Sequence, residues 1–227
     1  MSAISIVIEK KYYNKDPQSS DLGKNIVSTS IELMNQLGFE LFTFKKLASA
    51  IDSTEASIYR YFDNKHKLLV YITTWYWAWV EYMIDVSTHH IKASDEKLKE
   101  MIKIICHASE HISDIDMPGM QLSLLRKVVV SEADKTYLTK QVDEINNLGL
   151  FKGFKGLCHK VALVVNDINP AYPYPHALVS TILEASHQQA FFAQHLPSLT
   201  EISMKKKESL ERQVYTFIEE FVFKLIR

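Results

Sequence analysis

Two helix-start signals close together, in the stretch 43–69, constrain the fold of this chain more than any other feature. Thr43 and Thr54 each precede a segment with helical spacing, and a threonine hydroxyl there accepts a backbone N–H of the first turn. Between them, Asp52 is one of the few non-glycine residues that adopt the left-handed conformation of a tight turn. A helix, a tight turn and a second helix predict a helix-turn-helix, whose second helix enters the DNA major groove.

Apolar side chains recur at helical spacing in both segments, as expected for two short helices that pack on a shared core. In the second segment, Ile58 and Phe62 point one way and the polar and phenolic groups another. Asp63 or Asn64 is placed to cap a further, long helix from about Lys65 to His90. The first segment buries these residues: Phe44, Leu47, Ala48 and Ile51.

These residues and their neighbours resemble the signature of TetR-type transcriptional regulators. The resemblance rests on Leu47-Ala48, on Ser57 to Phe62, on Asn64 to Leu69 and on the lead-in from Ile31 to Thr43. It implies an all-α protein with a three-helix helix-turn-helix head and a larger helical ligand-binding and dimerisation body. The implied divisions are an N-terminal tail or arm (1–20), a DNA-binding domain (21–68) and the body (69–227).

The resemblance also implies partners and a mode of action. Such a regulator is a homodimer that binds a palindromic operator in double-stranded DNA and is released by an apolar small molecule. Phosphate contacts would position the head and base contacts would specify the site. The residues expected at the DNA are Thr43, Lys45, Lys46, Thr54, Glu55, Ala56, Ser57, Tyr59, Arg60, Tyr61 and Lys65.

Within that set, Ser57 and Arg60 are the expected base readers, because arginine pairs bidentately with guanine for about 1–3 kcal/mol of discrimination. Tyr59 and Tyr61 offer hydroxyls to phosphate, unless one of them packs inside the head. Residues 21–70 contain six Lys or Arg and six Asp or Glu, and Glu55 lies where phosphate should approach. A neutral head predicts weak nonspecific affinity. It also leaves open a lipid- or isoprenoid-binding accessory protein of the same fold that does not bind DNA.

All three tryptophans lie in the long helix predicted from Lys65, where aromatic side chains cover much of its surface. They are either core or the wall of an apolar ligand pocket, since such pockets are largely aromatic. The residues expected around the effector are Trp75, Trp79, Tyr82, Met83, Ile105, His107, Met120, Leu124, Phe151 and Phe154.

The remaining helices are predicted from apolar periodicity and from Gly and Pro breaks. An opening helix ends before Gly38, a glycine placed for a left-handed helix end. A capping box from Ser198 to Glu201 is expected to start the last helix. The expected helical ranges are 21–37, 94–113, 120–130, 133–148 with 150–166 (one long helix or two joined at Gly149), and 175–196.

The two C-terminal helices carry wide apolar stripes, which predict either completion of the core or a dimer interface, and the resemblance favours the dimer. The interface residues expected are Leu178, Ile182, Ala185, Phe192, Val214, Phe217 and Phe221.

The N-terminal twenty residues have no helical period. Lys10, Lys11 and Lys15 suit a basic arm in a minor groove, and the alternative is a mobile tail or a strap packed on the body.

No catalytic motif, cofactor or membrane span is expected. His107 and His111 lie one turn apart around Glu110, but no second ligand pair accompanies them, so no metal site is predicted. No G-x-S-x-G elbow or glycine-rich phosphate loop occurs, so no enzyme is expected. Two cysteines, no signal-peptide pattern and no run of about twenty apolar residues predict a cytoplasmic protein.

Overall fold

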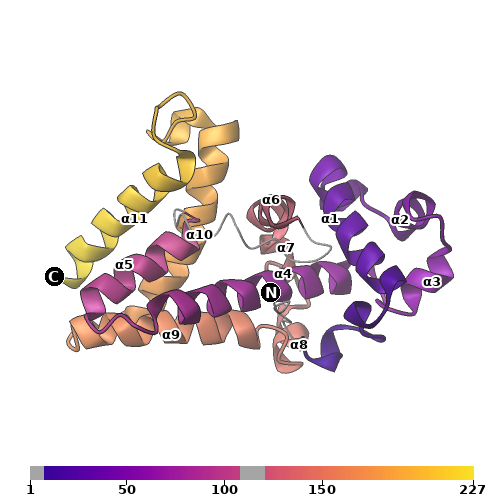
Figure 1. Cartoon of the computed structure of the whole chain (residues 1–227), viewed down its shortest axis with the longest axis horizontal. Helices are drawn as coiled ribbons and strands as arrows, with labels where there is room; N and C mark the ends of the chain where they lie inside the picture. The colour runs from indigo at the N-terminus through magenta and orange to yellow at the C-terminus, as the bar shows by residue number, and fades with distance from the viewer. Residues whose placement is uncertain (1–7, 108–120) are drawn as a thin grey trace. The chain divides into compact units, whose positions relative to one another are not determined.

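The computed structural model describes residues 8–107 and 121–227, and this part of the chain contains helices and no strand (Figure 1). The all-α prediction is confirmed. The elements, in order, are η1 Lys10–Tyr12, η2 Pro17–Ser19, α1 Asp21–Leu41, α2 Phe44–Ala50, α3 Glu55–Tyr59, α4 Lys65–Thr88, α5 Ser94–Ile105, α6 Leu122–Glu132, α7 Asp134–Tyr137, α8 Val142–Asn147, α9 Lys152–Ile168, α10 Pro175–His195, η4 Pro197–Leu199 and α11 Leu210–Ile226.

The described residues form two compact units, which are treated separately. Unit 1 comprises residues 8–78 and 121–153, and unit 2 comprises residues 79–107 and 154–227. The segment 21–68 lies wholly in unit 1, which also takes in α6, α7 and α8. Unit 1 is therefore larger than a three-helix head alone.

In unit 1, α1 is the central helix and contacts η2, α2 and α6 (Figure 1). Ser20 caps its start by accepting the Gly23 N–H at 3.2 Å. Gly38 interrupts it with φ 73°, as predicted for a helix-ending glycine, and a last turn follows. There the buried Glu132 of α6 accepts the Phe39 N–H at 3.1 Å and pairs with Lys135 at 2.6 Å.

Residues 8–20 pack on unit 1, in agreement with the strap alternative, and a role as a minor-groove arm stays a prediction. Ile8, Tyr12 and Pro17 are buried. The hydroxyl of Tyr12 donates to the carbonyl oxygen of Leu150 at 2.9 Å.

Unit 2 contains α5, α9, α10, α11 and the second half of α4. Helix α10 contacts both α11 and α5, and α11 contacts α5. Lys160 of α9 pairs with Glu81 and Asp85 of α4 at 2.9 and 2.7 Å. The C-terminal end is held by Arg227, which pairs with Asp95 at 2.7 Å.

Helix α11 carries two apolar stripes with different surroundings. One stripe faces the unit's interior at helical spacing and is buried: Leu210, Val214, Ile218, Val222 and Ile226. On another face, Phe217 and Leu225 are 46% and 47% exposed, and Phe221 between them is partly exposed. A second stripe left uncovered within one chain is what a dimer interface requires.

Three of the predicted interface residues are corrected by burial. Leu178, Ile182 and Val214 are at most 4% exposed and lie in the core of unit 2, so they offer almost no surface for an interface. Ala185, Phe192, Phe217 and Phe221 keep exposed surface.

The last helix does not start at the predicted capping box. Ser198 lies in the short η4, and α11 begins at Leu210 with Ser209 as its cap, accepting the Arg212 N–H at 3.2 Å. The intervening loop is held by Gln213, which accepts from Ser203 N at 3.0 Å and donates to the carbonyls of Ser203 and Glu208, both at 2.9 Å. These bonds satisfy the loop backbone without a helix.

Two other boundaries differ. The helix expected over 133–148 is split into α7 and α8, and Gly149, with φ 70°, is the joint before α9 as predicted. Helix α5 ends at Ile105 instead of Ser113, because His107 adopts φ 55°, which a helix cannot continue. Among the described residues, no helix combines the length and apolarity needed to span a bilayer.

Candidate nucleic-acid interface

The predicted helix-turn-helix forms in unit 1 with both threonine caps in place. Thr43 accepts the Lys46 N–H and Thr54 accepts the Ser57 N–H, each at 3.2 Å. Asp52 adopts φ 49°, the left-handed conformation expected of the turn residue. The Ser53 N–H then donates to the Ala48 carbonyl at 2.9 Å, which closes the turn.

The interior of this motif is apolar and closed. Leu47, Ile58 and Phe62 are fully buried. The ring of Tyr59 packs edge-on against Phe44, with centroids 5.1 Å apart, yet the side chain is 50% exposed. The apolar side of α3 is thus held by the core of the motif, and its opposite side faces solvent.

The exposed face of α3 and its flanks presents small and polar groups. Glu55, Ala56 and Arg60 are exposed and Ser57 is half-buried, with its hydroxyl 3.0 Å from that of Thr54. Thr43, Lys45 and Lys46 of the α2 side are also exposed. A row of such groups on a helix presented by a rigid scaffold suits base-edge and phosphate contacts.

Lys65 is not available for the phosphate contact predicted for it. Its ammonium donates to the carbonyls of Phe39, Glu40 and Phe42 at 2.9, 3.1 and 3.2 Å. All three donors of the ammonium are therefore used to satisfy the end of α1. Lys65 is a structural cap, a role that no local sequence pattern indicates because its partners lie far away along the chain.

Tyr61 is also corrected. The side chain is 2% exposed, and its hydroxyl shares a 2.8 Å hydrogen bond with Ser20. The alternative of packing inside the head thus applies to Tyr61, while Tyr59 remains 50% exposed. The sequence spacing was consistent with this burial, since Tyr61 lies three residues after the buried Ile58, although α3 itself ends at Tyr59.

Several cations near the interface are already engaged by protein groups. Lys67 pairs with Asp63, and Lys46 donates to the Leu41 carbonyl at 2.8 Å while remaining exposed. Within the described residues, the side chains of Lys45 and Arg60 make no ion pair or hydrogen bond with protein. These two cations are the ones most available to DNA.

The predicted effector residues are divided between the units, so an effector site stays a prediction. Trp75, Leu124 and Phe151 belong to unit 1. Trp79, Tyr82, Met83, Ile105, His107 and Phe154 belong to unit 2, and Met120 lies outside the described residues. Trp79 is buried, and its ring lies nearly parallel to that of His107 with centroids 6.1 Å apart. Tyr82 is exposed, unlike the other aromatic residues of this set in α4.

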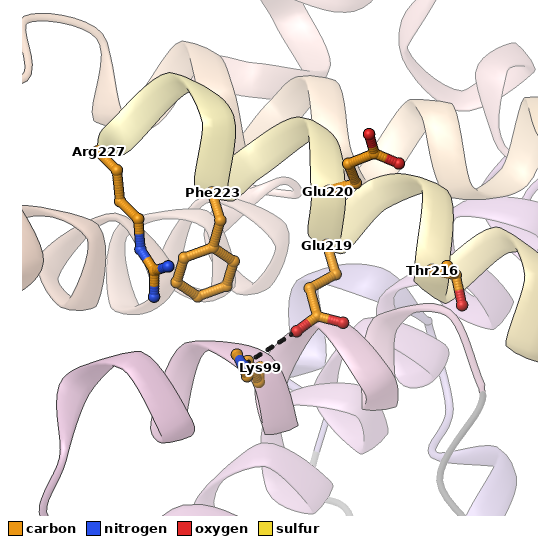
Figure 2. Close-up of a pocket in the computed structure, with 6 residues that line it drawn as sticks. All are labelled: Lys99, Thr216, Glu219, Glu220, Phe223 and Arg227. Carbon is orange, nitrogen blue, oxygen red and sulfur yellow. Dashed lines mark ion pairs between the residues drawn. The ribbon is translucent and has the colours of Figure 1, made fainter.

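A pocket of about 260 Å³ lies elsewhere in unit 2, between α5 and α11 (Figure 2). Lys99 and Glu219 pair across it at 3.2 Å, and the Arg227 guanidinium lies 4.9 Å from the Phe223 ring. Its other charged groups pair with residues outside the lining, Glu220 with Lys224 and Arg227 with Asp95. None of the predicted effector residues lines it.

The predicted pair of histidines is only partly within the described chain, because Glu110 and His111 fall outside it. In the residues that are described, no group of three or more His, Cys, Asp or Glu side chains is arranged to hold a metal ion.

The comparison with protein families agrees with this geometry. Residues 26–72 match the family described as bacterial regulatory proteins, tetR family. This segment is similar to the N-terminal domain of TetR-type regulators. The match covers α2, α3 and the beginning of α4, together with most of α1, and so includes the whole interface described above.

Several solved structures share the fold over nearly the full chain. The fatty acid degradation regulator FadR from Bacillus halodurans has a TM-score of 0.60 and 15% identity, covering 96% of each chain. The ketosteroid regulator KstR2 of Mycobacterium tuberculosis has a TM-score of 0.56 and 12% identity, covering 92% of this chain and 96% of its own. AibR, solved with isovaleryl coenzyme A and operator DNA, has a TM-score of 0.57 and 14% identity, covering 88% and 98%. No curated protein matches the sequence itself.

Proposed function

We propose that this chain is a dimeric, ligand-responsive transcriptional regulator that reads DNA with α3. The observation that carries the proposal is the exposed face of α3, capped by Thr54 and backed by the buried Ile58 and Phe62. The match of residues 26–72 to the tetR family, which includes α3, supports it. Ser57 and Arg60 would contact base edges, and Thr43, Lys45, Lys46 and Tyr59 would contact phosphate.

Dimerisation would supply the second reading helix. The uncovered stripe of Phe217, Phe221 and Leu225 on α11, with Ala185 and Phe192 on α10, is the surface proposed for it. A two-fold dimer presents the same surface twice, so the operator would be roughly palindromic with half-sites about one or more helical turns apart.

The proposed action is repression relieved by an apolar small molecule. An effector shifts the equilibrium only as far as it prefers one conformation of the regulator over the other. The names of similar structures include regulators of fatty acid degradation and of ketosteroids, and one solved with an acyl coenzyme A. These names support an apolar or acyl-bearing effector class for this chain.

A second function is favoured by one observation, the charge of the head. Glu55 is exposed at the start of α3, and Lys65 and Lys67 are committed to protein partners. An apolar-ligand carrier of the same fold that does not bind DNA would tolerate an acidic side chain and paired lysines there, although Lys45 and Arg60 stay unpaired within the described part of the chain.

Fluorescence anisotropy with a labelled duplex from the region upstream of the protein's own gene separates the two. The regulator predicts saturable binding by two chains per site, competed poorly by unrelated duplex. Absence of binding at low salt, together with uptake of an apolar probe by the same preparation, supports the carrier.

A further inference from the structure

We propose that residues 8–20 are a strap that positions α3, by holding the residues that follow it to the turn at Gly149 and Leu150. Every contact in this argument lies within unit 1. The positioning itself does not depend on DNA; only its consequence for operator affinity rests on the proposed function.

The strap is seated on α1 at a point where only glycine fits. A Cβ atom at Gly23 would lie 2.3 Å from the Pro17 carbonyl oxygen and 2.6 Å from the Pro17 Cα. Pro17 is buried, and the Asp16 carboxylate accepts the Gln18 N–H at 2.8 Å to shape the short η2 turn. The strap's C-terminal half is therefore in direct backbone contact with α1.

The strap's N-terminal half is attached through Tyr12. This ring is buried, and its hydroxyl lies 2.9 Å from the Leu150 carbonyl oxygen and 3.3 Å from that of Gly149. Burial raises the pKa of Tyr12 to about 12, so the hydroxyl keeps its proton and donates at physiological pH. Gly149 has φ 70° at this joint, a left-handed conformation that glycine adopts without steric cost.

Two residues further on, Asn14 holds the chain that leaves α3. Its N–H donates to the Tyr61 carbonyl at 2.8 Å, and its side-chain amide donates to the Asp63 carboxylate at 2.6 Å. The Lys15 ammonium lies 5.0 Å from the Tyr61 ring centroid. Carbonyls at the end of a helix have no partner within it, and the strap supplies one here.

The two attachments are close enough to act as one. The two residues of chain from Tyr12 to Asn14 span at most about 7 Å when extended. A displacement of the turn at Leu150 is therefore passed to Tyr61 through a short connection. Helix α3 has only five residues and few hydrogen bonds of its own, so its orientation depends on what holds its ends. Tyr12 and Asn14 are thus positioning residues, and neither needs to touch DNA.

Hydrogen–deuterium exchange on the free, full-length protein tests the strap with a matched pair of variants. Tyr12→Phe removes the bond to Leu150 and keeps the ring. Tyr13→Phe removes an equivalent hydroxyl, whose 3.2 Å bond to the Ile8 carbonyl stays inside the strap. Losing one hydrogen bond worth about 1 kcal/mol should speed amide exchange about fivefold. The strap predicts that increase over residues 54–63 in Tyr12→Phe and no change there in Tyr13→Phe.

An increase confined to residues around 145–153, or equal increases in both variants, would overturn the proposal. Gly23→Ala, which displaces Pro17, provides a second route and should also raise exchange over 54–63 if the strap acts as a unit.

DNA titrations then distinguish this proposal from the proposed function. With a duplex that binds the wild type, Tyr12→Phe should weaken affinity several-fold without changing the salt dependence, because no phosphate contact is lost. If no duplex binds the wild type but amide exchange over residues 54–63 still increases in Tyr12→Phe alone, the strap proposal is supported and the DNA-binding function is refuted. If a duplex binds the wild type and Tyr12→Phe changes neither amide exchange nor affinity, the strap proposal is refuted while the DNA-binding function is retained.

Discussion

Replacing Lys65 with methionine separates a structural cap from a DNA contact. The ammonium of Lys65 donates to three carbonyls at the end of α1, at 2.9 to 3.2 Å. A hydrogen bond from a charged donor is worth about 1.5–3 kcal/mol, but these three share one half-exposed ammonium, and water replaces part of them. We therefore expect Lys65→Met to lower the free energy of unfolding by about 2 kcal/mol in total.

Thermal unfolding followed by circular dichroism measures this loss. For a chain of this size, 1 kcal/mol corresponds to about 2–4 °C, so the midpoint should fall by about 4–8 °C. Lys67→Met is the matched control, because it removes the same charge from an exposed pair with Asp63 that is worth about 0.5 kcal/mol. A midpoint for Lys65→Met within about 1 °C of the wild type would refute the assignment of Lys65 as a cap.

Two further predictions concern the exposed stripe of α11 and the cap of α3. Phe217→Glu should convert the protein to monomers in sedimentation velocity. Leu163→Glu, at a residue of α9 with similar exposure, should leave the dimer intact. If the Phe217→Glu variant also stays dimeric, α11 is not part of the interface. Thr54→Ala should cost about 1 kcal/mol through loss of the α3 cap, seen as a drop of about 2–4 °C in the unfolding midpoint; an unchanged midpoint would contradict the capping bond to Ser57.

The helix-turn-helix was predictable because its determinants are local. Thr43, Thr54 and Asp52 act on backbone within a few residues of themselves, and helical spacing separates Ile58 and Phe62 from the polar face. The same local logic located Gly38 and Gly149 as joints.

What the sequence did not predict depends on partners remote along the chain. Lys65 and Tyr61 have side chains suited to phosphate, and only the folded structure shows the carbonyls and the Ser20 hydroxyl that engage them. Ser198 has a better capping pattern than Ser209, yet Gln213 holds the loop between them. On α10 and α11, periodicity indicated apolar faces, but it did not say which face the chain's own core would cover.

The central claim is that α3 reads duplex DNA, and Arg60→Ala tests it most directly. Lys24→Ala is the control, since it removes one positive charge from the same head at an exposed position paired with Asp21. If Arg60 reads a guanine, its loss should weaken binding by about 5- to 150-fold per half-site and relax sequence preference there, while Lys24→Ala binds nearly as the wild type. Equal affinity and unchanged preference in Arg60→Ala, or a wild-type protein that binds no duplex at low ionic strength, would contradict the account.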